Sequence, residues 1–138
     1  MSIEYKINEP VTADEFIDVL VKSTLGERRP IEDRKCIEGI ISNSNLMATA
    51  WEDAQLVGIA RSVTDFHYSC YLSDLAVAQS HQCIGVGKNL LSFTQEQLGL
   101  KCKLILLAAP EAHAYYETLG FENNPRGWVL NRDATIKS

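Results

Sequence analysis

A glycine-containing segment between a predicted strand and a predicted helix places the strongest constraint on how this chain can fold. Residues 69–77 have the length and the aromatic and aliphatic content of a strand, and Gln82-x-x-Gly85-x-Gly87 follows after a short connection. The next helix has apolar side chains at helical spacing, and the apolar run at residues 104–108 is typical of a strand buried on both faces. A strand, a helix and a strand in this order give two parallel strands joined by a right-handed crossover. We therefore predict an α/β sheet with a parallel pair at its centre.

The segments on either side extend this sheet. Apolar alternation predicts a strand at residues 3–7, and a capping box formed by Thr12 and Glu15 predicts the start of a helix that ends at Gly26. A second amphipathic helix follows. The remaining predicted elements are an antiparallel meander at 46–51, 56–63 and 69–77, a helix at about 111–119 and a last short strand at 128–130. The order β-α-α-β-β-β-α-β-α-β predicts an α/β (mixed α+β) fold whose sheet is antiparallel first and parallel in the middle.

The composition allows one domain and excludes several classes of protein. With 138 residues, the chain has room for a single domain, residues 1–138. Eighteen acidic against thirteen basic side chains give a net charge of −5, which argues against a nucleic-acid partner. No apolar run is long enough to cross a membrane, and the first residues lack a signal-peptide pattern, so export is not expected. The four cysteines stand singly in or beside apolar segments, as reduced thiols do, and we expect a cytoplasmic protein.

The glycine segment has the chemistry of an anion site. Gly85 and Gly87 permit close main-chain approaches that a Cβ would hinder. The helix that follows offers unpaired N–H groups and a positive dipole end, which suit a phosphate or a pyrophosphate. Two better-known phosphate motifs do not match: a Walker loop would need Gly in place of Gln82 and Ser or Thr in place of Asn89, and a dinucleotide fingerprint would need Gly in place of Leu90. A glycine-rich helix entry without a ligand is the alternative.

Two adjacent tyrosines form a second candidate feature. Tyr115 and Tyr116 lie in the predicted helix that ends at Gly120, and helical spacing lets one of them point inward while its neighbour faces elsewhere. A tyrosine hydroxyl beside a bound ligand can serve as a proton donor to a thiolate or an amine. The alternative is a tyrosine that packs before a Schellman-type helix end.

Taken in order, these features resemble the GNAT acetyltransferase superfamily over nearly the whole chain. The glycine segment is similar to the family's Gln/Arg-x-x-Gly-x-Gly/Ala motif, residues 72–77 to the strand before it, and residues 114–121 (Ala-Tyr-Tyr-Glu-Thr-Leu-Gly-Phe) to the later Tyr-Glu-x-Leu-Gly-Phe segment. Residues 57–61 with Asp65, and residues 120–127, also resemble the branch that contains plant and cyanobacterial serotonin N-acetyltransferases. The resemblance implies the GNAT fold, a twisted mixed sheet of about six to seven strands flanked by about four helices.

The resemblance also implies acetyl-CoA as the donor. The main-chain N–H groups that would hold its pyrophosphate are those of Gln82, Cys83, Ile84, Gly85, Val86, Gly87 and Lys88. The pantetheine arm would lie where the parallel strands splay apart, beside Leu75, Ala76 and Val77, because main-chain groups without a strand partner need another one. A backbone N–H in this strand would polarise the thioester carbonyl. Tyr116 matches the family's general acid, which would lie beside the cofactor and protonate the departing thiolate.

A general base is less clearly marked. Asp74 is the nearest acidic candidate on the central strand, with Asp65 and Glu117 as weaker ones. The alternatives are that Asp74 is a solvated or hydrogen-bonded strand residue and that the proton leaves through ordered water. No metal site is expected, because His113 and Glu117 would supply only two ligands.

We therefore expect an N-acetyltransferase that transfers an acetyl group by direct attack of a primary amine. The acceptor is expected to be a small amine, an amino acid or a peptide N-terminus, while nucleic acid and membrane are not expected partners and a homodimer is left open. Asp65, Tyr68, Tyr71 and Ser73 predict a pocket with aromatic walls and a carboxylate for an ammonium group, unless these side chains pack under the first two helices. The alternative function is a non-catalytic acyl-CoA-binding or sensing module of the same fold.

Overall fold

The computed structural model describes residues 2–138 and divides them into two compact units. The first unit ends at Leu107, and the second is Ala108–Ser138. The elements of the first unit are β1 (Glu4–Ile7), α1 (Ala13–Ser23), the 3-10 helix η1 (Leu25–Arg28), α2 (Arg34–Ser42), β2 (Leu46–Glu52), β3 (Gln55–Thr64), β4 (Ser69–Val77), the 3-10 helix η2 (Gln79–His81), α3 (Val86–Glu96) and β5 (Lys103–Leu106).

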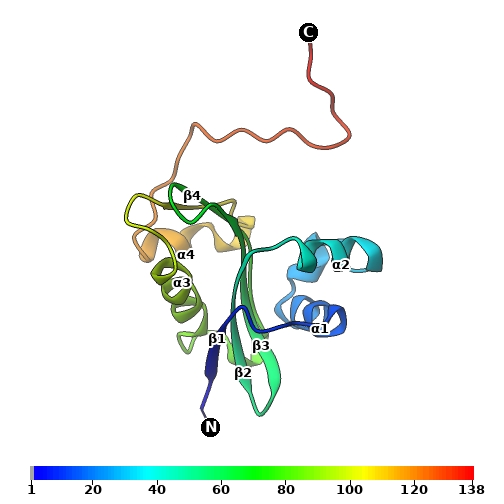
Figure 1. The fold of residues 1–138 in the computed structure, drawn as a ribbon, viewed down its shortest axis with the longest axis vertical. Coiled ribbons are helices and arrows are strands. Elements are labelled where there is room, and N and C mark those ends of the chain that lie inside the picture. Colours follow the sequence, from blue (N-terminus) through cyan, green and yellow to red (C-terminus); the bar gives the residue numbers. More distant parts are fainter. Residues whose placement is uncertain (1) are drawn as a thin grey trace. The chain divides into compact units, whose positions relative to one another are not determined.

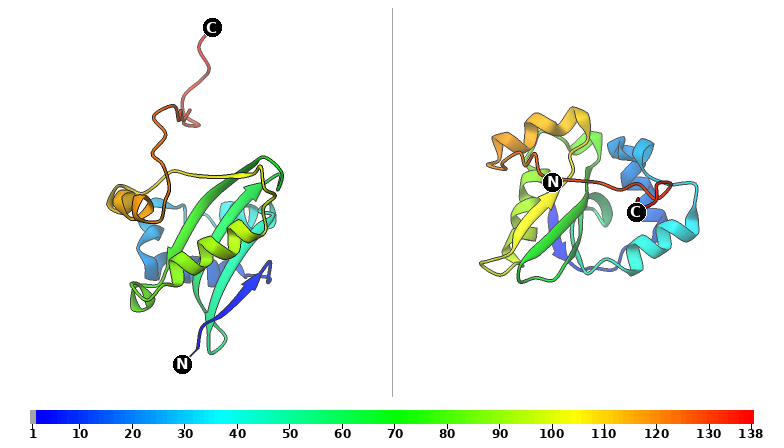
Figure 2. Two further views of the ribbon diagram at one scale, coloured as in Figure 1. Left: turned by 90° about the vertical axis from the view of Figure 1, so that its left-hand side faces the viewer. Right: turned by 90° about the horizontal axis from the view of Figure 1, so that it is seen from above.

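One mixed sheet organises the first unit. Its five strands stand in the order β1-β2-β3-β4-β5, antiparallel from β1 to β4, with β5 parallel to β4. Helices α1 and α2 cover one face of the sheet and α3 lies across the other (Figures 1 and 2). The predicted mixed sheet is confirmed, with antiparallel strands first, but the parallel pair β4–β5 lies at the edge of the described sheet and not in its middle as predicted.

The helices of the first unit begin where the sequence provides caps. Thr12 Oγ1 accepts the Glu15 N–H at 3.1 Å and Glu15 Oε1 accepts the Thr12 N–H at 3.0 Å, so the predicted capping box forms. The helix ends earlier than predicted, because Thr24 adopts a left-handed conformation (φ 75°) and Gly26 falls inside η1 instead. The connection from α1 to α2 is therefore a structured turn rather than a simple polar loop.

Apolar side chains from both faces of the sheet form the core. On the α1/α2 face, Phe16, Leu20 and Ile37 pack with Ile59 and Ala76 from the sheet. On the other face, α3 contributes side chains of which Val86 and Leu90 are 2% and 0% exposed. These two approach β3 at Gly58, where an added Cβ would meet Leu90 Cδ1 at 3.0 Å and Val86 Cγ1 at 3.1 Å. The absence of a side chain at position 58 thus brings α3 close to the sheet.

The second unit contains η3 (Pro110–Ala112) and α4 (His113–Thr118), which together replace the single helix predicted at 111–119. A Schellman motif ends α4, as its glycine predicts: the Gly120 N–H donates to the Glu117 carbonyl and the Phe121 N–H to the Tyr116 carbonyl, each at 3.1 Å, with Gly120 at φ 96°. The aromatic ring of Phe121 packs edge-on against that of Tyr116, with 5.5 Å between centroids.

The prediction of a strand at residues 128–130 is wrong. The described chain therefore lacks the final β of the predicted order and has fewer strands than the expected six to seven. Trp128 is 93% exposed and these residues have no strand conformation. Just before them, Asn124 draws the chain into a turn: its side chain accepts the Arg126 N–H at 2.9 Å and its carbonyl accepts the Gly127 N–H at 3.4 Å. The backbone therefore makes local hydrogen bonds where the prediction needed a neighbouring strand.

The burial predicted for the run at 104–108 is also wrong. β5 is the edge strand of the described sheet, and Ile105 is 44% exposed. Among the described residues, no helix has the length and apolar character needed to span a bilayer.

Candidate functional site

The two parallel strands at the edge of the sheet part in the middle of β4. β4 pairs with β5 only from Ser69 to Leu72. At the next residue its register with β3 also shifts: Ser62 pairs with Leu72 but Arg61 pairs with Asp74, which leaves Ser73 as an extra residue. A β-bulge at Ser73 thus coincides with the point where β5 ends, and within the described residues the rest of β4 has no strand partner on that edge.

Main-chain groups in the second half of β4 face this open edge. The N–H of Ala78, just after β4, donates to the Val57 carbonyl of β3 at 2.9 Å. Because successive residues of a strand direct their main-chain groups to opposite edges, Ala76 also faces β3, while Leu75 and Val77 face away from it. The side chain of Gln82 donates to the Val77 carbonyl at 2.9 Å, which agrees with this orientation. Of the three strand residues that the sequence singles out, two present backbone groups at the open edge and Ala76 does not.

The glycine segment forms an uncapped entry to α3. Cys83 and Gly85 both adopt left-handed conformations (φ 66° and 91°), and Gly85 is the N-cap residue, which carries no side-chain cap. The first-turn N–H groups of Val86, Gly87 and Lys88 therefore have no intrahelical partner. A Cβ added at Gly85 would find no atom within 4 Å. Unpaired donors, open space and the positive helix end fit a phosphate group.

His81 fixes the start of this segment. Its Nε2 atom lies 3.0 Å from Glu52 Oε1 at the end of β2, and its Nδ1 atom lies 2.7 Å from Ser80 Oγ. Only 17% of the His81 side chain is exposed. The sequence pattern places this histidine in a loop and gives no sign of its partner, because Glu52 is far from it along the chain.

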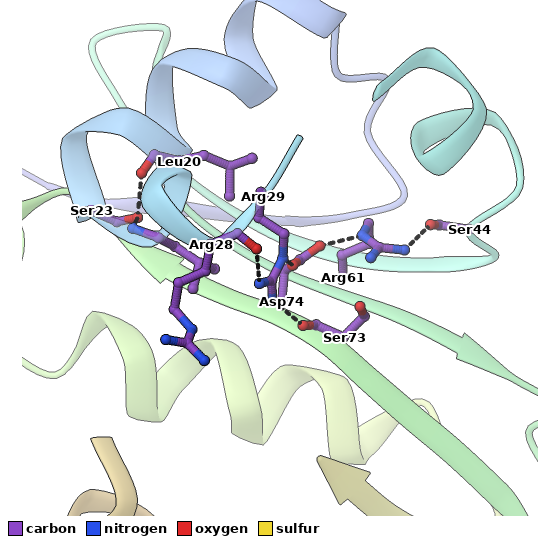
Figure 3. A network of polar contacts seen from close by, with 9 residues as sticks. Leu20, Ser23, Arg28, Arg29, Ser44, Arg61, Ser73 and Asp74 are labelled. Atoms are coloured by element: carbon purple, nitrogen blue, oxygen red, sulfur yellow. Dashed lines mark hydrogen bonds and ion pairs between the residues drawn. The ribbon is translucent and has the colours of Figure 1, made fainter. Parts of the chain in front are cut away.

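Asp74 lies in a buried cluster of charged side chains (Figure 3). Its side chain is 0% exposed. Its Oδ1 atom accepts Arg29 Nε from the α1–α2 connection at 2.5 Å, and its Oδ2 atom accepts Arg61 Nε from β3. Arg61 Nη1 in turn donates to Ser44 Oγ at 2.8 Å.

This arrangement favours the alternative interpretation of Asp74, a hydrogen-bonded strand residue. A base must reach the proton that it removes, whereas both carboxylate oxygens of Asp74 are already bonded to guanidinium groups in the interior. Arg29 and Arg61 are the residues of this cluster that the sequence pattern does not reveal. Position 61 lies among apolar residues of a predicted strand, and an arginine there needs a buried acidic partner. This is the one signal in the sequence for the contact between Arg61 and Asp74.

The side chains predicted to form an acceptor pocket are partly occupied by other contacts. Asp65 Oδ1 accepts the N–H groups of Ser69, Tyr68 and His67 at 2.8–3.0 Å, and these bonds lower the pKa of Asp65 to about 2. The ammonium of Lys103 lies 3.7 Å from the centroid of the Tyr68 ring. Asp65 therefore stabilises the turn before β4, and the protein's own lysine occupies one face of Tyr68.

Tyr116 belongs to the second unit. Burial, followed by the neighbouring Tyr115, raises the pKa of Tyr116 to about 12. Its hydroxyl therefore stays protonated at neutral pH, as a proton donor requires. Tyr115 is 39% exposed, and burial raises the pKa of its hydroxyl as well.

Metal and disulfide chemistry find no support in residues 2–138. No group of three or more His, Cys, Asp or Glu side chains is placed to hold a metal ion there. Cys36, Cys70, Cys83 and Cys102 are free cysteines.

Comparison with known proteins agrees with these features. The family profile described as "Acetyltransferase (GNAT) domain" matches residues 23–127. An uncharacterized N-acetyltransferase, ycf52-like, from the cyanobacterium Prochlorococcus marinus is 27% identical, with 83% of this chain and 68% of that protein covered.

Solved structures share the fold. A GNAT family acetyltransferase from Streptococcus pneumoniae superposes with a TM-score of 0.74 at 22% identity, over 95% of this chain and 99% of that one. The aminoglycoside N-acetyltransferase AAC(6')-Iy in complex with CoA superposes with a TM-score of 0.72 at 17% identity, over 96% of each chain. At these identities the likeness concerns the fold alone.

Proposed function

Because this chain belongs to the GNAT acetyltransferase family, we propose that it transfers an acetyl group from acetyl-CoA to a primary amine by direct attack. One observation carries the proposal: the open edge of β4 leads, through η2, directly into the uncapped N-terminus of α3. An elongated ligand can bond to both sites at once if it carries amide groups for the edge of β4 and a pyrophosphate for the N-terminus of α3. The complex of the structurally similar AAC(6')-Iy with CoA supports the same choice of donor.

The main chain supplies the contacts that we propose for acetyl-CoA. The pyrophosphate is held by N–H groups of residues 83–88, above all those of the first turn of α3, whereas the Gln82 N–H already donates to the Gln79 carbonyl at 3.4 Å. The pantetheine amides bond to the backbone of Leu75 and Val77. Ala76 is 2% exposed and its backbone faces β3, so we assign it no contact.

The proposed reaction needs one hydrogen-bond donor and one proton donor. A backbone N–H at the open edge of β4 polarises the thioester carbonyl. The amine nitrogen forms a bond to the carbonyl carbon, and the carbon–sulfur bond breaks. The Tyr116 hydroxyl then gives its proton to the departing sulfur, and the resulting tyrosinate regains a proton from water. The role of Tyr116 rests on its motif, and its hydroxyl carries the required proton at neutral pH. Both oxygens of Asp74 are engaged, so we propose that the amine loses its proton to water.

The proposed acceptor is a small amine, an amino acid or a peptide N-terminus. The net charge of −5 supports an acceptor that is not nucleic acid. AAC(6')-Iy, which also has a solved complex with CoA-S-monomethyl-acetylneamine, is an example of a structural neighbour with a small amine acceptor. We propose that the reaction takes place in the cytoplasm. Sedimentation of the purified protein would distinguish a monomer from a homodimer.

A pair of glycine variants tests the donor site. Gly85→Glu introduces a carboxylate where we place the phosphates, and we expect at least a tenfold loss of acetyl-CoA affinity in calorimetric titration. Gly39→Glu is the matched control, because a Cβ at Gly39 in α2 also meets no atom within 4 Å. Gly85→Asn separates charge from backbone strain, since asparagine tolerates the left-handed conformation. Unchanged affinity in Gly85→Glu would show that the site assignment is wrong.

Turnover distinguishes an enzyme from a binding module. Thiol release from acetyl-CoA is followed across arylalkylamines, polyamines, amino acids and peptides, with reactions lacking acceptor as the blank for the protein's own free cysteines. An enzyme gives steady acceptor-dependent release. A module that only binds acyl-CoA gives tight binding in the titration and no release with any acceptor.

A further inference from the structure

We infer that Arg29 is a positioning residue that keeps β4 separated from β5 beyond Leu72, an inference that rests on the function proposed above. The α1–α2 connection, which carries Arg29, is far from β4 in sequence. The Arg29 side chain nevertheless bonds to two consecutive residues of β4, Ser73 and Asp74.

Three features meet at Ser73. The pairing of β4 with β5 ends at the residue before it, the register of β4 with β3 shifts across it, and its carbonyl accepts Arg29 Nη2 at 2.8 Å. A strand carbonyl normally accepts from a neighbouring strand, and a buried one without any partner is costly. Arg29 thus supplies the donor for the bulge residue at the place where β5 stops. Without this donor, the Ser73 carbonyl loses its bond to Arg29, and only the pairing of the flanking residues with β3 and the Arg61–Asp74 ion pair hold the bulge.

The guanidinium group suits this task because several of its donors are fixed at once. Nε donates to Asp74 Oδ1 at 2.5 Å, Nη2 to the Ser73 carbonyl at 2.8 Å and Nη1 to the carbonyl of Arg28 at 3.0 Å. The last bond holds the guanidinium group against the α1–α2 connection. The Arg29 side chain therefore links this connection to the bulge. A lysine could pair with Asp74 but lacks the planar fork that reaches Ser73 at the same time.

Asp74 fixes the orientation of the guanidinium group. It is buried and holds Arg61 on its second oxygen, while Arg61 also bonds to Ser44. Figure 3 shows the two arginines approaching the carboxylate from different segments of the chain. Arg29 is therefore held in place from the sheet as well as from its own loop.

The consequence for function lies a short way along the strand. Leu75 and Val77, whose backbone we propose to contact the pantetheine arm, follow Ser73 by two and four residues. A shift of the bulge moves these donors directly. The turn at the start of α3 lies beyond η2 and is tied to β2 through His81 and Glu52, and its contact with β4 is the bond from Gln82 Nε2 to the Val77 carbonyl. Arg29 should therefore affect the acetyl end of the donor far more than the phosphate end.

A two-ligand experiment tests this separation. Acetyl-CoA and ADP, which carries a pyrophosphate but no pantetheine arm, are titrated into the wild type, Arg29→Met, Arg29→Lys and the control Arg28→Met. The Arg28 side chain is exposed and makes none of the bonds that define the cluster. In thiol release with an active acceptor, we expect Arg29→Met to lose about 10- to 100-fold in kcat/KM for acetyl-CoA, because a misplaced donor costs rate. In the titration, Arg29→Met should bind ADP as the wild type does, because the phosphate site remains. Arg29→Lys should recover only part of the loss.

Amide hydrogen exchange in the ligand-free proteins gives an answer that is independent of turnover. In Arg29→Met we expect exchange at Asp74 and Ala76, whose N–H groups face β3, to rise at least tenfold, with β2 unchanged. Unaltered exchange there, or equal losses of ADP and acetyl-CoA affinity, would overturn the inference. If the wild type neither binds nor consumes acetyl-CoA, the proposed function fails, and exchange alone decides whether Arg29 holds the bulge.

Discussion

At the scale of single residues, Tyr116 combines a packing role with the chemistry of a proton donor. Its ring is the apolar partner of Phe121 in the Schellman motif, and its hydroxyl is held in the protonated form by a pKa of about 12. The two properties depend on different parts of the side chain. The packing interpretation of the tyrosine is therefore confirmed, and the catalytic one stays a prediction that a conservative substitution can isolate.

Removal of the Tyr116 hydroxyl should slow turnover and leave the protein folded. Tyr116→Phe keeps the ring and its contact with Phe121, so we expect unchanged thermal stability and acetyl-CoA affinity. The turnover number should fall by roughly 10- to 1000-fold, which overlaps the usual contribution of one positioned acid. Steady-state thiol release with an active acceptor measures this effect. Tyr115→Phe serves as the control, and turnover equal to the wild type in Tyr116→Phe would leave Tyr116 a packing residue only.

The Asp74 cluster should matter for stability far more than any surface ion pair. Asp74→Leu leaves two guanidinium groups in the interior without their carboxylate, and breaking a buried pair in this way costs about 3–5 kcal/mol. Equilibrium urea unfolding measures the loss. Asp14→Asn removes the exposed partner of Arg34 and should leave the urea midpoint unchanged. A small effect of Asp74→Leu would mean that the cluster does not stabilise the fold.

At the scale of elements, the sequence predicts well whatever depends on neighbouring residues. The limits of β4 match the predicted 69–77, the capping box forms, and Gly120 ends α4 in the predicted manner. These features depend on local alternation, local caps and backbone conformation. The hairpin between β2 and β3 is also found, although its turn places Asp53 and Ala54 at positive φ without a glycine.

The features that the sequence misses all depend on distant partners. Residues 128–130 have the composition of a strand, but a strand also needs a neighbour, and Asn124 provides a local turn instead. Asp74 has the position of a base on the central strand, yet its function is decided by Arg29 and Arg61, which lie far away along the chain. Leu75 and Val77 could be anticipated from the resemblance, whereas the bulge that frees their backbone could not.

The contact between α3 and β3 offers a prediction at the same scale. In Gly58→Ala the new Cβ would lie 3.0 Å from Leu90 Cδ1 and 3.1 Å from Val86 Cγ1. We expect a loss of about 1–3 kcal/mol in the free energy of unfolding, because overfilled cores shift their neighbours. The same change at Gly39 meets open space inside a helix and should stabilise by about 0.5–1 kcal/mol. Urea unfolding of both variants should show opposite signs; equal signs would contradict this account of α3 packing.

At the scale of the whole molecule, ligand binding and folding should be linked. A ligand that binds only the native state adds about 2.7 kcal/mol at a concentration of 100 times its Kd. Acetyl-CoA should therefore raise the melting temperature of the wild type in a concentration-dependent manner. At the same acetyl-CoA concentration the increase should be clearly smaller in Gly85→Glu than in Gly39→Glu. An equal increase in both variants would point to binding outside the α3 N-terminus.

The turn at the start of α3, where we propose that phosphate binds, offers main-chain donors, and this leaves its side chains available for other uses. Cys83 lies exposed in that turn and no hydrogen bond depends on its thiol. Once the other exposed cysteine, Cys36, is replaced by serine, a thiol-reactive dye should attach mainly at position 83. The fluorescence of such a conjugate would report the arrival of a ligand at α3 directly, with no acceptor needed and before any chemistry takes place.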